Sequence, residues 1–139
     1  MSNAPFCVTI LRRPFNGKAG RDIELLHYAV QIDGHGIYEF GRYDGPGKLK
    51  HRDGRHSNEE VVTAFKVTGH TPEDVIAYMK SITNGKVWEY FGTNCVSVAK
   101  KVTERYGPPQ CLRLLEAGEN NYKRVAKALL KECNDLIKW

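Results

Sequence analysis

The stretch that decides the fold is residues 26–40, which read LHYAVQIDGHGIYEF. Two runs of β-branched and aromatic side chains flank the turn signal Asp33-Gly34, and this pattern predicts a β-hairpin. The side chains of a strand alternate between two faces, so the first arm has His27, Ala29 and Gln31 on one face and Tyr28, Val30 and Ile32 on the other. We expect the apolar face to pack in a core and the face of His27 to hold chemistry.

Further strands and helices are expected around this hairpin. Residues 6–13 (FCVTILRR) and 61–67 (VVTAFKV) predict strands, whereas residues 41–60, with little apolar content, indicate a long loop. Helices are expected between the cap Thr71 and the stop Asn84-Gly85, at residues 95–106, and at about residues 122–137. With no internal repeat or linker, we expect residues 1–139 to form one α+β domain with an antiparallel sheet packed against helices.

The composition is that of a globular protein and excludes several function classes. Of the 139 residues, 41% are apolar and 27% charged, and the net charge of +5 weakly favours anionic partners. The densest basic stretch has no interleaved aromatic residue for base stacking, so it indicates a solvated loop and no nucleic-acid partner; its members are Lys48, Lys50, Arg52 and Arg55. We expect no transmembrane segment and no signal peptide. Synthesis in the cytoplasm is therefore expected, with any delivery beyond it left to a dedicated secretion system.

The cysteines do not have the spacing of a metal site or a disulfide framework. The chain has four of them, Cys7, Cys95, Cys111 and Cys133, and no two form a CxxC pair. We therefore expect no metal and no cofactor. Three of the cysteines lie where packing is the simpler explanation, and Cys95 is the exception.

Cys95 follows the helix-capping residue Asn94, so it lies in the first turn of a predicted helix. The unpaired N–H groups and the macrodipole at this end favour a thiolate, and the same N–H groups can bind an oxyanion. Gly92 would let a substrate approach closely. A base is still needed, and His27 on a rigid strand suits that task. Glu39, on the returning arm of the hairpin, is the candidate that orients the imidazole.

These residues resemble a known family. The run from His27 to Gly34, the polar residue twelve positions after His27, and the later Asn94-Cys95 are similar to the circularly permuted NlpC-type thiol peptidase superfamily, which includes the lecithin:retinol acyltransferase-like enzymes. The resemblance implies a papain-like fold in which the histidine strand precedes the cysteine helix. It also implies that Cys95 is the nucleophile, His27 the base and Glu39 the orienter. We expect Gly92, Asn94 and Tyr28 to lie in the substrate and oxyanion environment.

Departures from the family pattern guide the choice of substrate. Acyltransferase members commonly continue Asn-Cys with an acidic residue, a histidine and an aromatic residue, whereas Cys95 is followed by Val96-Ser97-Val98. They also tend to have histidine at the position of Glu39. We therefore expect amide hydrolysis, with peptidoglycan stem peptides as the first substrate and an inhibitor or immunity protein as a candidate partner. Two alternatives remain open, a protease or deconjugating enzyme acting on proteins and a non-catalytic binding module of the same fold.

Overall fold

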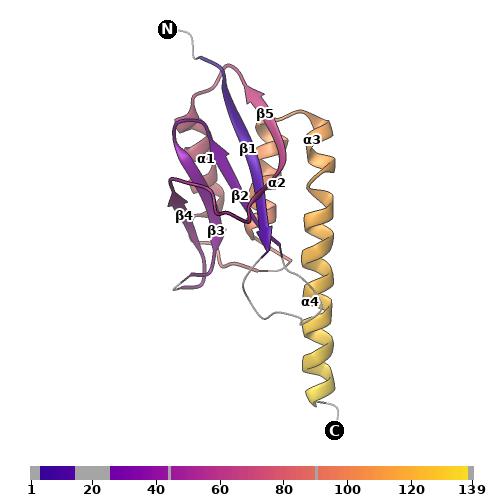
Figure 1. The fold of residues 1–139 in the computed structure, drawn as a ribbon. Coiled ribbons are helices and arrows are strands. Elements are labelled where there is room, and N and C mark those ends of the chain that lie inside the picture. Colours follow the sequence, from indigo (N-terminus) through magenta and orange to yellow (C-terminus); the bar gives the residue numbers. More distant parts are fainter. Residues whose placement is uncertain (1–3, 15–25, 44, 90, 138–139) are drawn as a thin grey trace.

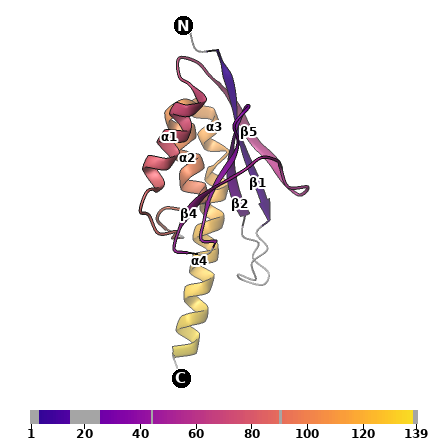
Figure 2. The ribbon, with the colours of Figure 1, turned by 90° about the vertical axis from the view of Figure 1, so that its left-hand side faces the viewer.

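The computed structural model describes residues 4–14, 26–43, 45–89 and 91–137, without the side chains of residues 129 and 132–137. It is an α+β structure with a five-stranded antiparallel sheet in the order β4-β3-β2-β1-β5 and with its helices on one face (Figures 1 and 2). The strands are β1 Phe6–Pro14, β2 Leu26–Ile32, β3 Gly36–Gly41, β4 Lys48–Arg52 and β5 Glu60–Val67. The helices are α1 Pro72–Thr83, α2 Cys95–Tyr106, α3 Pro109–Arg113 and α4 Glu116–Ile137.

The predicted hairpin is confirmed as β2 and β3. The two strands pair from Val30 opposite Tyr38 to Ile32 opposite Gly36. Gly34 and Gly36 at the turn have φ angles of 75° and 84°, in the left-handed region that glycine adopts without strain. The other edge of β2 pairs with β1 along its whole length, so β2 lies inside the sheet and its backbone is held in place.

The prediction of a continuous loop over residues 41–60 is wrong, because residues 48–52 form β4 against β3. This edge strand pairs through its backbone, and Lys48 and Lys50 are exposed, so it has no apolar alternation to detect. The last helix also begins earlier than expected, at Glu116, and α3 precedes it. The dipeptide Asn16-Gly17 is a turn signal that predicts the end of the first strand, but it and the side chain of Cys133 lie outside the described residues.

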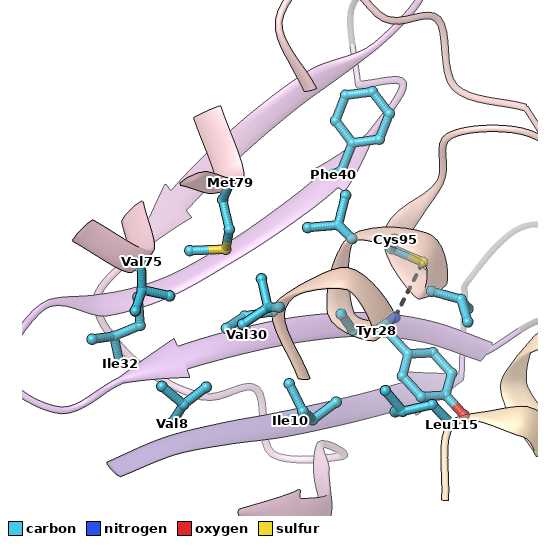
Figure 3. Packing of buried hydrophobic residues seen from close by; sticks show 14 of the residues in the cluster. Val8, Ile10, Tyr28, Val30, Ile32, Phe40, Val75, Met79, Cys95 and Leu115 are labelled. Carbon is cyan, nitrogen blue, oxygen red and sulfur yellow. Dashed lines mark hydrogen bonds between the residues drawn. The ribbon is translucent and has the colours of Figure 1, made fainter. Parts of the chain in front are cut away.

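The core lies between the sheet and the helices. Both predicted helix caps are confirmed, since Thr71 and Asn94 each form a capping box at the start of α1 and α2. Figure 3 shows side chains of α1 over one end of the apolar face of β2 and the first turn of α2 over the other end. The buried cluster includes Val8, Ile10, Tyr28, Val30, Ile32, Phe40, Val75, Met79 and Leu115. In the described part of the chain, no helix combines the length and apolar character needed to cross a membrane.

The opposite face of the sheet is also covered. Leu11, Ala29 and Ile37 form a small apolar cluster there, separate from the main core. The connection between β4 and β5 passes over this face (Figure 2), and in it Arg55 donates to Gln31 of β2 at 2.8 Å. The connection therefore covers the face of β2 that includes His27 and Gln31. Polar groups buried on this face need hydrogen-bond partners within the protein.

Candidate active site

Cys95 is the first residue of α2, and the preceding loop is built to present it. The side chain of Asn94 accepts a hydrogen bond from the backbone N–H of Ser97 at 2.9 Å and donates to the carbonyl of Glu89 at 2.9 Å. These two bonds tie Glu89 to the start of the helix. Cys95 is only 2% exposed, so its sulfur lies within the protein where charges interact strongly.

Three groups surround the Cys95 sulfur. The backbone N–H of Tyr28 donates to Sγ at 3.3 Å (Figure 3), and the Tyr122 hydroxyl from α4 lies 2.7 Å from it. The third group is the imidazole of His27, which forms a side-chain hydrogen bond with the sulfur. Burial raises the pKa of a thiol, but the His27 charge and the bonds from Tyr122 and Tyr28 outweigh it and lower the pKa of Cys95.

His27 contacts the predicted orienting residue. Its Nε2 lies 2.6 Å from Oε2 of Glu39, and both side chains are almost completely buried. Burial disfavours the charged imidazole, but the negative charges of Cys95 and Glu39 raise the pKa of His27 to about 9. Because Nε2 faces Glu39, Nδ1 is the ring nitrogen that remains for Cys95. Near neutral pH the arrangement therefore favours a thiolate beside an imidazolium.

Two arginines also hold the Glu39 carboxylate. Nη2 of Arg13 lies 3.2 Å from Oε2, and Nε of Arg52 lies 3.3 Å from Oε1. Burial would raise the pKa of this carboxyl, but the hydrogen bond and charge of His27, followed by the charges of Arg13 and Arg52, lower it to about 2. Glu39 is thus ionised throughout the pH range in which His27 titrates.

The structure brings together the three residues predicted for the centre of the site. Cys95, His27 and Glu39 come from α2, β2 and β3 and meet at one end of the sheet. Cys95 belongs to the helical layer, whereas His27 and Glu39 alternate with core residues of their strands. The three side chains meet because the Cys95 sulfur reaches the backbone of β2, where it accepts the N–H of Tyr28.

The three residues predicted for the substrate environment do not all lie in one place. Gly92 and Asn94 line a pocket of about 100 Å³ between the start of α2 and α4, together with Val96 and Tyr122. A Cβ at Gly92 would come within 2.6 Å of a carboxylate oxygen of Glu89, so part of the space beside this glycine is filled by the protein itself. Tyr28 serves the site only through its backbone, because its ring is fully buried in the core.

Sequence patterns did not identify four residues of the site, namely Tyr122, Arg13, Arg52 and Tyr43. Tyr122 is indistinguishable from the other apolar positions of its helix until the structure brings it to Cys95. Arg13 lies opposite His27 in the register of β1 and β2. A sequence prediction that paired these two strands in register would have placed Arg13 beside His27. Tyr43 follows β3 with a φ of 48°, and burial, followed by the negative charge of Glu39, raises the pKa of its phenol.

Two other cysteines, Cys7 and Cys111, make none of the contacts described for this site. Cys7 and Cys111 are free thiols, and Cys111 is buried and accepts a hydrogen bond from the hydroxyl of Thr63 at 3.2 Å. Within the described ranges, no three histidine, cysteine or acidic side chains gather as metal ligands would.

Comparisons of the chain with protein-family models, with curated proteins and with solved structures find no match in any of the three, so the geometry around Cys95 is what supports a function.

Proposed function

We propose that this protein is a cysteine-dependent amide hydrolase in which Cys95 is the nucleophile, His27 the acid and base, and Glu39 the residue that orients His27. The observation that carries the proposal is the buried chain of contacts from Cys95 through His27 to Glu39, with 2.6 Å between Nε2 and Oε2. A structural cysteine needs neither an imidazole nor two further donors at its sulfur. A nucleophile needs a thiolate, and these groups stabilise one.

The reaction follows from the protonation states of the pair. The Cys95 thiolate attacks the amide carbonyl, and the C–N bond breaks as His27 donates its Nδ1 proton to the leaving amine. Neutral His27 then removes a proton from water, and the resulting hydroxide attacks the thioester carbonyl. The C–S bond breaks, a carboxylic acid leaves, and the thiolate and imidazolium are restored.

The start of α2 supplies donors for the oxyanion. In the first turn of a helix, the N–H groups have no intrahelical acceptor, and the side chain of Asn94 accepts that of Ser97. The N–H groups of Cys95 and Val96 are therefore the candidates to bind the oxygen of the tetrahedral intermediate. The pocket between α2 and α4 borders the same turn and has room for a small group of the substrate.

We also propose that the fold is the permuted papain-like one. In support, the histidine strand β2 precedes the cysteine helix α2, the polar partner lies on the next strand, and the first turn of α2 contacts the backbone of β2. Peptide amides of peptidoglycan are the proposed substrate, since the net charge of +5 suits an anionic wall polymer.

The test is digestion of purified peptidoglycan sacculi, with new amine termini measured by mass spectrometry. Wild-type protein should release muropeptides and Cys95→Ala should not. Cys111→Ala is the matched control, because Cys111 is also buried and hydrogen-bonded but lies outside the site, so it should retain activity. Equal release by wild type and Cys95→Ala would refute the mechanism. No release by the wild type, with cleavage of an isopeptide-linked protein conjugate, would exclude peptidoglycan and assign a protein substrate.

A further inference from the structure

The carboxylate of Glu39 is surrounded by more positive charge than it can neutralise. Besides His27, it binds Nη2 of Arg13 and Nε of Arg52, and both guanidiniums are mostly shielded from solvent. Arginine stays charged at every accessible pH. Without a further anion, these two cations would leave a net positive charge beside the imidazole and would disfavour its protonation.

Glu59 supplies that anion. This residue ends the connection between β4 and β5, and its side chain is completely buried, with 0% exposed. Its two oxygens accept from the two terminal nitrogens of Arg52, with 2.9 Å between Nη1 and Oε1, and Oε2 lies 4.0 Å from Nε of Arg13. Glu59 therefore contacts both of the arginines that hold Glu39.

The connection between β4 and β5 is folded to keep this carboxylate in place. The backbone N–H of His56 donates to Oε1 of Glu59 at 2.9 Å, and the N–H of Glu59 donates to the carbonyl of His56 at 3.1 Å. Nη1 of Arg52 also donates to the carbonyl of Gly54 at 2.7 Å. The segment predicted as a solvated basic loop is thus organised around one buried guanidinium.

We propose that Glu59 is a positioning residue, which balances the charges of Arg13 and Arg52 so that Glu39 holds the His27 imidazolium beside Cys95. This inference rests on the proposed function, because it assigns a role within the same site. The four outer groups, two arginines and two glutamates, sum to zero charge, as do the thiolate and imidazolium. Removing Glu59 alone leaves one excess positive charge within the buried network.

The other charged groups that face this network do not replace Glu59. In the described part of the chain, His27 faces Cys95 from α2, Glu39 from β3 and Arg13 from β1. Glu39 also meets the neutral phenol of Tyr43. Lys50 lies opposite Glu39 in the strand register, but it is exposed and its ammonium stacks on the Tyr43 ring 4.9 Å away. Tyr43 and Lys50 add no negative charge, the charge of Glu39 is already matched by one arginine and that of Cys95 by His27, and Glu59 is the anion that offsets the second arginine.

The first experiment compares Glu59→Gln with the wild type. Two readouts are used: titration of the His27 ring by NMR, and the rate of Cys95 alkylation by iodoacetamide as a function of pH. We expect the alkaline inflection of both curves to move down by about one pH unit, a tenfold loss of proton affinity for His27. Glu60→Gln is the matched control, because Glu60 is the next residue and pairs with Arg12 but has a 61% exposed side chain. It should leave both curves unchanged.

The second experiment separates charge from packing. The double variant Glu59→Gln/Arg52→Gln restores charge balance, so its inflection should return toward the wild-type value, whereas a packing role predicts a further disturbance. Glu59→Asp keeps the charge and should titrate like the wild type even if Glu59→Gln does not fold. An inflection that Glu59→Gln leaves in place, or a double variant shifted further than the single one, would overturn this role. If the His27 titration and the Cys95 alkylation curve of the wild type share no inflection, the result refutes the proposed function itself, apart from any role of Glu59.

Discussion

Glu39→Gln removes one negative charge from the pair with His27 while it retains an oxygen that can accept a hydrogen bond. The lost partner lies 2.6 Å from the imidazole, and both groups are buried. An opposite charge at such a distance typically changes a pKa by about one to three units, or roughly 1.4 to 4 kcal/mol. The pKa of His27, which is raised to about 9 in the native chain, should therefore fall into the range of about 6 to 8.

The assay is the pH dependence of Cys95 alkylation, followed by mass spectrometry of the modified peptide. In wild type, Cys95 should react at pH values where ordinary thiols are protonated, and the plateau should extend to about pH 9, where the imidazolium loses its proton. In Glu39→Gln, the pH range over which the alkylation rate stays constant should end at a lower pH. Glu73→Gln is the control, because Glu73 also pairs with a histidine, His35, at 3.7 Å, but it is 69% exposed.

The outcome that contradicts this reasoning is a Glu39→Gln profile that superimposes on the wild-type profile in a folded protein. Circular dichroism must accompany the assay, because Arg13 and Arg52 lose one of the two carboxylates that they share, and breaking a buried ion pair by removing one partner costs about 3–5 kcal/mol. A variant that is folded but has an unchanged plateau would show that Glu39 does not stabilise the imidazolium.

Three further predictions concern the same site and its support. Glu39 has a pKa lowered to about 2 from an ordinary 4.5, so its contribution, roughly 3 kcal/mol, should be present above pH 4.5 and be lost as the pH falls through 2; urea unfolding should show this acid limb in wild type and not in Glu39→Gln. Tyr122→Phe removes a donor to the thiolate, about 1.5–3 kcal/mol for a charged acceptor, so alkylation of Cys95 at acid pH should slow about ten- to a hundredfold, and an unchanged rate would exclude that bond. Asn94→Ala should lower the unfolding free energy by about 0.5–2 kcal/mol and also slow alkylation, whereas Thr71→Ala, which uncaps the other capped helix, should lower stability alone.

Local signals predicted much of the fold. The hairpin was identified by its turn and its alternation, and α1 and α2 were identified by the caps Thr71 and Asn94, because these interactions join residues close in sequence. β4 could not be identified in the same way. Its pairing with β3 is made by backbone groups, which every sequence has, while its exposed lysines resemble those of a loop.

The residues of the site also divide into those that local sequence signals predict and those that only the folded structure brings together. The hairpin predicts that His27 and Glu39 lie on neighbouring strands, and the position of Cys95 follows from its helix cap. Tyr122 reaches the sulfur from a helix 27 residues further along the chain, a contact that no local pattern encodes. Arg52 and Glu59 are close in sequence, but charged side chains in a glycine-rich segment usually lie in solvent, and only the enclosing fold shows that these two are buried together.

The most direct test of the account is the ultraviolet absorbance of the Cys95 thiolate across pH, taken as the difference between wild type and Cys95→Ser. An ion pair with His27 predicts a thiolate signal already present at neutral pH, well below the ordinary cysteine value of about 8.5, and its loss in His27→Gln. A signal that appears only near or above that value, and that His27→Gln leaves unchanged, would mean that the sulfur is an ordinary buried thiol and would contradict the proposed chemistry.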